Sequence, residues 1–172
     1  MKGSALIAVV GAEGSGKTTL AQALAGRLQA RLVPEELRAF VDQHQRPPSR
    51  AEQSDVLAAQ LAAEAGAGVG GGWVVSDAGA LMTAVYSRLY YRDDSLWEPA
   101  LAHHRTAYVL TLWCGIDIPW LSDPGYRDGP DWRRRGHLMI AEAVERGELA
   151  AVLVEGSVER RLEAALTALG DY

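Results

Sequence analysis

A glycine-rich segment near the start of the chain has the residue types and the spacing needed to bind phosphate. Residues 11–19 read Gly-Ala-Glu-Gly-Ser-Gly-Lys-Thr-Thr, which matches the pattern G-x-x-x-x-G-K-[ST]. The glycines allow successive backbone N–H groups to point at one anion, and the start of the following helix adds positive potential. In such a loop Lys17 would reach the β- and γ-phosphates of a nucleoside triphosphate, and the Thr18 hydroxyl would hold Mg²⁺. The sequence therefore predicts a nucleotide phosphate site.

The elements around this loop must place it at the edge of a sheet. An apolar run precedes the loop and a helical pattern follows it. Four more short apolar runs, separated by helical patterns, predict an α/β fold with a doubly wound, five-stranded parallel sheet. Strands are expected at residues 6–10, 31–33, 73–77, 107–113 and 150–154. Helices are expected at residues 16–29, 35–44, 51–67, 80–91, 100–105 and 131–146, and from the cap Ser157 to about residue 169.

Carboxylates follow two of the expected strands. Asp77 ends the third apolar run, and Glu35 and Glu36 follow the second. The carboxyl ends of parallel strands face the ligand in doubly wound sheets, so Asp77 could orient Mg²⁺ or accept a proton from a hydroxyl group. One of the two glutamates could act as general base, with Arg38 on the same helix face. The structural alternatives are that Asp77 caps the next helix and that the glutamates form a solvated first helical turn.

An irregular segment at residues 117–135 combines proline and glycine with arginine. A loop of this composition beside a helix is typical of a lid that closes over phosphates, and an ordinary charged surface loop is the alternative. Its arginines are Arg127, Arg133, Arg134 and Arg135. Elsewhere, Tyr90 and Tyr91 are expected to be packing residues, and His103 and His104 are expected at the surface.

Length and composition limit the class of protein. The chain has 172 residues, 48% hydrophobic residues and a net charge of −5, which suits one domain, residues 1–172, with a full core. A dedicated nucleic-acid binder would usually be basic, so no nucleic-acid partner is expected. Cys114 is the only cysteine, and no run of about 18 apolar residues is present. We therefore expect a cytoplasmic protein that does not interact with membranes.

The absence of a guanine-reading motif narrows the choice among proteins with a phosphate loop. The chain contains no Asn, and its only lysines are Lys2 and Lys17, so it lacks the Asn-Lys-x-Asp motif of a guanine-specific switch. A large ATPase machine would need a longer chain. What remains is a small kinase that transfers a phosphoryl group to a small acceptor.

The combined pattern resembles the NadR-type ribosylnicotinamide kinase family over nearly the whole chain. The loop at residues 11–19 is followed by a Glu-x-x-Arg element at Glu35 and Arg38, and by a strand that ends in Asp77 with Thr83 after it. Residues 117–120 read Asp-Ile-Pro-Trp, and Gly156 and Ser157 resemble the closing element of the family. The family often has Asp-Thr-Asp where this chain has Asp-Ala-Gly at residues 77–79.

The resemblance implies transfer of a phosphoryl group from ATP, with Mg²⁺, to the 5′-hydroxyl of nicotinamide riboside, which gives nicotinamide mononucleotide. Alternatives are a kinase for another nucleoside-like acceptor and a nucleotide-binding regulatory ATPase without a small acceptor. The implied catalytic residues are Lys17, Asp77, Glu35 and Arg127. The implied acceptor-binding residues are Glu35, Arg38, Asp77 and Trp120, and Thr18 and Asp77 would hold the metal. The implied ATP-binding residues are Gly11, Glu13, Gly14, Ser15, Gly16, Lys17, Thr18, Thr19, Arg133, Gly156 and Ser157.

Overall fold

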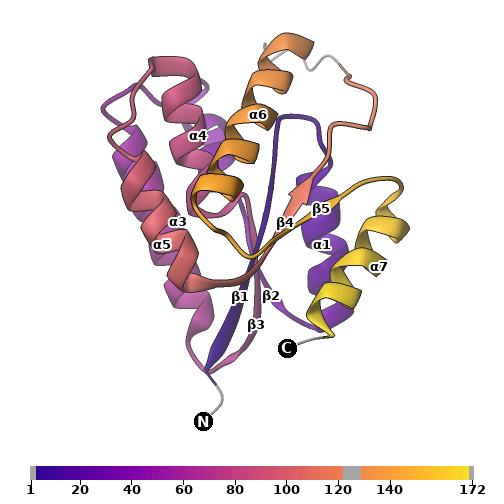
Figure 1. Cartoon of the computed structure of the whole chain (residues 1–172). Helices are drawn as coiled ribbons and strands as arrows, with labels where there is room; N and C mark the ends of the chain where they lie inside the picture. The colour runs from indigo at the N-terminus through magenta and orange to yellow at the C-terminus, as the bar shows by residue number, and fades with distance from the viewer. Residues whose placement is uncertain (1–2, 122–128, 171–172) are drawn as a thin grey trace.

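The computed structural model describes residues 3–121 and 129–170, and its centre is a five-stranded parallel sheet. The strand order is β2-β3-β1-β4-β5, so the predicted α/β fold with five parallel strands is confirmed (Figure 1). The strands are β1 (Ser4–Gly11), β2 (Arg31–Val33), β3 (Gly72–Asp77), β4 (Tyr108–Cys114) and β5 (Ala151–Val154). The helices are α1 (Lys17–Leu28), α2 (Glu36–His44), α3 (Gln53–Gly68), α4 (Gly79–Tyr91), α5 (Trp97–Ala107), α6 (Pro130–Arg146) and α7 (Val158–Leu169).

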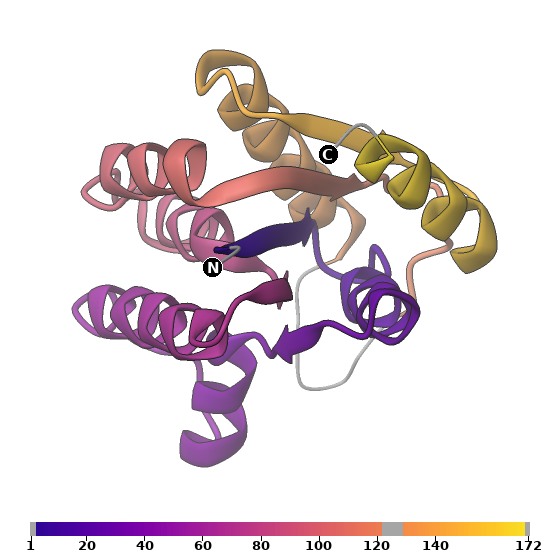
Figure 2. The ribbon, with the colours of Figure 1, turned by 90° about the horizontal axis from the view of Figure 1, so that it is seen from below.

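Helices cover both faces of the sheet. Helices α3 to α6 pack on one face and α1 and α7 on the other, while α2 lies beyond the β2 edge (Figure 2). In β1, Ala8 and Val10 belong to the core under α3 to α6, whereas Ile7 and Val9 belong to the core under α1 and α7. Side chains of a strand point alternately to its two faces, and both faces of β1 are covered. This explains why the β1 sequence is continuously apolar.

The strand register brings the predicted site residues to one edge of the sheet. Val9 of β1 pairs with Asp77 of β3, and Val33 of β2 pairs with Ser76. The phosphate loop, Asp77 and the chain after β2 therefore leave the sheet at nearly the same level. This is the carboxyl edge, where doubly wound folds bind their ligands.

Two sequence expectations need correction. Helix α5 begins at Trp97 rather than at residue 100. Leu96, the residue before the helix, already has a helical conformation, and Trp97 is buried. His104, expected at the surface, is 2% exposed, and its Nε2 lies 2.7 Å from Thr111 Oγ1 of β4. Its neighbour His103 is half-buried. No helix within residues 3–121 and 129–170 is both long enough and apolar enough to cross a membrane.

The burial of His104 should make stability depend on pH. Burial, together with His103, lowers the pKa of His104 from 6.5 to about 3. The unfolded chain therefore takes up a proton between these values and the folded chain does not, so stability falls as the pH falls below 6.5. We expect the wild type to lose about 3 kcal/mol more than His104→Gln between pH 7 and pH 4 in urea titrations. His44→Gln, at an exposed histidine of α2, should retain the wild-type pH dependence. Parallel pH curves for wild type and His104→Gln would contradict this assignment.

Candidate active site

The phosphate loop has a backbone that only glycine accommodates easily. Gly14 and Gly16 have φ angles of 66° and 85°, in the left-handed region. A Cβ at Gly11 would lie 2.4 Å from Ser15 Oγ and 2.9 Å from Cys114 Cβ, so this position needs glycine for close approach. Helix α1 begins at Lys17 without a side-chain cap, so its first N–H groups remain available at the loop. Lys17 Nζ lies 3.4 Å from the Ala12 carbonyl oxygen.

Thr18 and Asp77 meet at the base of this loop. Thr18 Oγ1 donates a 2.6 Å hydrogen bond to Asp77 Oδ2. The other oxygen, Oδ1, is buried and has no hydrogen-bond partner within the described part of the chain. Asp77 lies one residue before Ala78, the cap position of α4, and its one hydrogen-bonded oxygen is bonded to Thr18, so the structure does not show Asp77 in the alternative role of a helix cap. A hydroxyl and an incompletely satisfied carboxylate beside a phosphate loop fit a Mg²⁺ ion, which prefers oxygen ligands.

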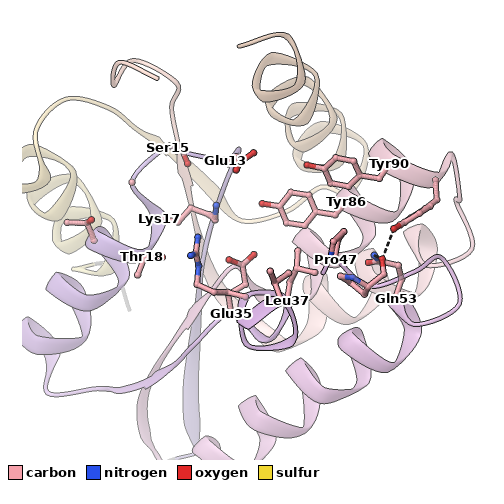
Figure 3. A pocket seen from close by; sticks show the side chains of 17 residues that line it. Glu13, Ser15, Lys17, Thr18, Glu35, Leu37, Pro47, Gln53, Tyr86 and Tyr90 are labelled. Carbon is pink, nitrogen blue, oxygen red and sulfur yellow. Dashed lines mark hydrogen bonds between the residues drawn. The ribbon is translucent and has the colours of Figure 1, made fainter. Parts of the chain in front are cut away.

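Glu35 lies across the site from Lys17, and the two side chains point toward each other in Figure 3. It stands just before α2 but makes no side-chain capping hydrogen bond to that helix. Burial raises the pKa of Glu35 above 4.5, Lys17 and Arg38 oppose this shift, and Asp77 adds to it. A carboxyl group with a raised pKa, close to the lysine of a phosphate loop, is suited to accept a proton.

One pocket of about 390 Å³ joins the phosphate loop to an aromatic wall. The wall consists of Tyr86, Tyr90 and Tyr91 of α4, with Leu37 and Pro47 nearby (Figure 3). The Tyr86 and Tyr90 rings stack at 6.0 Å. The whole pocket is lined by Glu13, Gly14, Ser15, Gly16, Lys17, Thr18, Thr19, Glu35, Leu37, Arg38, Val41, Pro47, Pro48, Gln53, Tyr86, Tyr90 and Tyr91.

The aromatic wall extends from α4 to α6. Trp132 of α6 stacks on Tyr90 with ring centroids 5.4 Å apart. Burial raises the pKa of Tyr86 well above 10, and nearby Glu35, Glu13 and Asp77 act in the same direction, so Tyr86 remains a neutral phenol. Tyr90 and Tyr91 were expected to be packing residues, but both face the pocket.

A buried arginine supports the phosphate loop from behind. Arg161 of α7 is 1% exposed, and its Nη1 donates a 2.5 Å hydrogen bond to the Ser15 carbonyl oxygen. Its Nη2 donates to Asp117 Oδ1 at 2.7 Å, and its Nε donates to the Gly156 carbonyl oxygen at 3.1 Å. Asp117 Oδ2 also accepts a hydrogen bond from Gly156 N. The segments that begin at Asp117 and Gly156 are thereby tied to the loop, as a nucleotide site shared by the three would require.

The predicted lid arginines have different positions. Arg133 is buried, and its Nη2 donates to the carbonyl oxygens of Gly14 at 3.1 Å and Ile118 at 2.8 Å. Arg127 lies outside the described residues. Trp120 is not part of the pocket lining, and its Cδ1 lies near Gly14 at the top of the loop. Ser157 caps α7 by accepting a hydrogen bond from Arg160 N.

Sequence reasoning assigned no role to several residues that build this site. Tyr86, which follows the Asp77 element of the family pattern, lines the pocket, and so does Gln53; Arg161, in the closing element, holds the loop. A usable signal for Gln53 was its place in a helical pattern with Val56, Leu57, Gln60 and Glu64, which lie on one buried face of α3. Polar residues at core positions of a helix are expected to have specific partners.

Removing the Asp77 charge should weaken the link between metal and nucleotide binding. We expect Mg²⁺ to raise the affinity of the wild type for ADP in calorimetry, and Asp77→Asn to reduce this gain about tenfold or more. Affinity for ADP without Mg²⁺ should change little, because the loop backbone is untouched. Asp42→Asn, at an exposed acid of α2, is the matched control. An unchanged Mg²⁺ effect in Asp77→Asn would rule out this metal site.

Comparisons with known proteins agree with the fold and the loop. The family model described as an AAA domain matches residues 6–161. No curated protein sequence matches the chain. A NadR structure in complex with NR and one in complex with NAD and AMP-PNP have TM-scores of 0.75 and 0.76 and are each 22% identical over 98% of this chain. The chain covers 51% and 49% of those proteins, about half their length.

Shorter kinases share the fold along their full length. A thymidylate kinase from Ehrlichia chaffeensis has a TM-score of 0.74 and 16% identity, covering 97% of this chain and 99% of its own. A deoxyadenosine kinase from M. mycoides with products bound has a TM-score of 0.66 and 12% identity, covering 97% and 100%. The resemblance to NadR is therefore confirmed for the fold, which is also that of nucleoside and nucleotide kinases. The AAA-domain model spans residues 6–161, most of the chain. The chain therefore belongs to that family of phosphate-loop proteins.

Proposed function

We propose that this protein transfers the γ-phosphoryl group of ATP to a hydroxyl group of a small aromatic riboside. The observation that carries the proposal is the single pocket that joins the phosphate loop to the tyrosine wall, with Glu35 between them. A donor phosphate held at Lys17 and an acceptor held against Tyr86 would meet at the Glu35 carboxyl group. Such positioning supplies a large part of the rate in phosphoryl transfer.

Nicotinamide riboside is the first acceptor to test. A flat aromatic base suits a pocket with Tyr86, Tyr90 and Tyr91 on one side and the apolar Leu37 and Val41 nearby. A pocket of about 390 Å³ is in the size range of small-molecule sites. A NadR structure of the same fold was determined in complex with NR, which supports this choice among ribosides.

Each residue of the site would have a separate role in the reaction. Lys17 and the loop N–H groups would hold the phosphates of ATP and offset the negative charge that develops during transfer. Mg²⁺, held beside Thr18 and Asp77, would neutralise further charge on the phosphate oxygens. Glu35 would accept the proton of the acceptor hydroxyl as that oxygen attacks the γ-phosphorus and the bond to ADP breaks. Arg38 would orient the acceptor.

Kinase activity should depend on Lys17. With Mg²⁺-ATP and coupled detection of ADP, we expect nicotinamide riboside to stimulate ADP release more than thymidine, thymidine monophosphate or deoxyadenosine does. Lys17→Ala should lower kcat/KM at least about 100-fold, because it removes a charge that contacts the transferred phosphoryl group. Arg27→Ala, at an exposed cation of the same helix, should behave as the wild type. Release of ADP that no acceptor stimulates would instead favour a nucleotide-dependent regulatory protein.

The role of Glu35 as base should appear in the pH profile. Only the ionised carboxylate accepts a proton, so kcat should rise with pH through an inflection above 4.5, and Glu35→Gln should lower kcat and remove that inflection. Glu36→Gln, whose side chain does not line the pocket, is the matched control.

The same group should also affect stability. Because its pKa is higher in the folded than in the unfolded state, ionisation of Glu35 destabilises the fold as the pH rises above 4.5. Between pH 4.5 and the raised pKa of Glu35, the stability of Glu35→Gln relative to the wild type should therefore increase. In the pH profile of kcat, an inflection that persists in Glu35→Gln would transfer the role of base to Asp77.

A further inference from the structure

The two carboxylates assigned to the reaction stand directly before helices that they do not cap. Glu35 is the cap residue of α2 and makes no side-chain capping hydrogen bond, and Asp77 lies one residue before Ala78, the cap position of α4, and is bonded to Thr18 instead. Acidic residues at such positions usually accept hydrogen bonds from the first free N–H groups of the helix. Here other side chains take over that task, which leaves both carboxylates to the site.

Helix α2 is capped from α3. The N–H of Glu36, its first residue, donates a 3.0 Å hydrogen bond to Gln60 Oε1. Gln60 is buried, and its Nε2 donates to Ser76 Oγ at 3.0 Å and to Glu64 Oε1 at 3.3 Å. Gln60 therefore connects the residue after Glu35 with the residue before Asp77.

Helix α4 is capped from β4. The N–H of Ala80 donates a 2.9 Å hydrogen bond to the Tyr108 hydroxyl, which also lies 3.1 Å from the position of a Cβ at Gly79. The turn between Asp77 and α4 is tight, because Ala78 has a φ of 80° and Gly79 a φ of 60°. A non-glycine residue at such a φ persists only where its surroundings fix it. The Tyr108 hydroxyl contacts the two residues that follow Ala78, Gly79 and Ala80.

Both caps lead to one buried group, the Glu64 carboxyl of α3. Glu64 is 4% exposed, and it accepts hydrogen bonds from the Tyr108 hydroxyl at 2.8 Å and from Ser76 Oγ at 2.5 Å. The proton directions follow from the donors. A backbone N–H can only donate, so the Tyr108 hydroxyl accepts from Ala80 and directs its own proton to Glu64. Burial, with Glu64 nearby, raises the pKa of Tyr108 well above 10, so the phenol keeps that proton.

We propose that Gln60, Glu64 and Tyr108 are positioning residues that set the placement of Glu35 relative to Asp77. None of the three lines the pocket, and they act by holding the starts of α2 and α4 to one buried carboxyl group. The inference rests on the proposed function, because it assigns the two carboxylates to the reaction. Hydrogen bonds of this outer kind fix catalytic groups within the narrow tolerance that a reaction needs.

The experiment compares near-isosteric variants that remove one connection each. Gln60→Met removes the cap of α2, and Tyr108→Phe removes the cap of α4. Thr111→Val is the matched control, because it breaks the buried hydrogen bond to His104 and touches neither helix start. Glu64→Gln keeps its shape and serves as an additional variant if Tyr108→Phe does not fold. For each protein the measurements are kcat and KM for ATP, the Mg²⁺-dependent gain in ADP affinity, and Tm.

We expect Gln60→Met and Tyr108→Phe to lower kcat about tenfold or more, with KM for ATP within about twofold of the wild type. Tyr108→Phe or Glu64→Gln should also reduce the Mg²⁺-dependent gain in ADP affinity severalfold, because each loosens the segment that carries Asp77. Thr111→Val should lower Tm and leave kcat and the Mg²⁺ effect within about twofold. This split separates positioning from a general loss of stability.

The inference is overturned if the variants lose Tm but keep kcat and the Mg²⁺ effect of the wild type. A wild type that binds Mg²⁺-ADP but phosphorylates no acceptor overturns the proposed function alone. In that case the Mg²⁺ effect in Tyr108→Phe and Glu64→Gln still decides the inference: a reduced effect supports it and an unchanged effect refutes it. A wild type that binds no nucleotide at all overturns both.

Discussion

The hydrogen bond from Thr18 to Asp77 is the contact on which the arrangement of the site depends. It joins the first turn of α1 to the end of β3, two segments 59 residues apart in the chain. It can form only because β1 and β3 are parallel neighbours in a register that pairs Val9 with Asp77. A shift of one residue would turn Asp77 to the opposite face of the sheet. The apolar side chains of β1, buried on both faces, set the strand register. The register in turn sets the distance between Thr18 and Asp77.

Arginine, rather than lysine, stabilises the loop backbone. Arg161 of α7 and Arg133 of α6 come from helices on opposite faces of the sheet and donate to the carbonyl oxygens of Ser15 and Gly14. A planar guanidinium can donate in several fixed directions, so one side chain can join the loop to the segments that begin at Asp117 and Gly156. Lys17 is left as the compact cation inside the loop. The positive charge of the site is thus divided between arginines that hold the loop backbone and two cations, Lys17 and Arg38, that line the pocket.

The sequence was sufficient to predict the sheet, the phosphate loop and the edge at which the carboxylates lie. Those features follow from local patterns, such as the apolar run of β1 and the spacing from Gly11 to Thr18, which few structures satisfy. The pocket wall was predicted less well. Tyr90 and Tyr91 are as compatible with a core as with a pocket, and only the packing of α4 against α6 decides between them.

The burial of His104 and the connection from Glu64 to two helix starts were also beyond sequence reasoning. Each depends on contacts between segments that are far apart in the chain, and their separation does not predict the contact. Glu64 and Tyr108, for example, are 44 residues apart. The Ala78 turn shows the same limit. Nothing in the residue type of alanine indicates a φ of 80°, since this conformation is imposed by the neighbours of the turn.

The position of Cys114 has a consequence for studying the protein in solution. The only thiol of the chain lies at the end of β4, beside its register partner Gly11 of β1, where it is fully buried and where burial raises its pKa to about 11. A thiolate is the reactive form, so alkylating reagents meet an inert group as long as β1 and β4 stay paired. The rate at which such a reagent labels Cys114 therefore reports how often the pairing of β1 and β4 beside the phosphate loop opens, without an engineered cysteine.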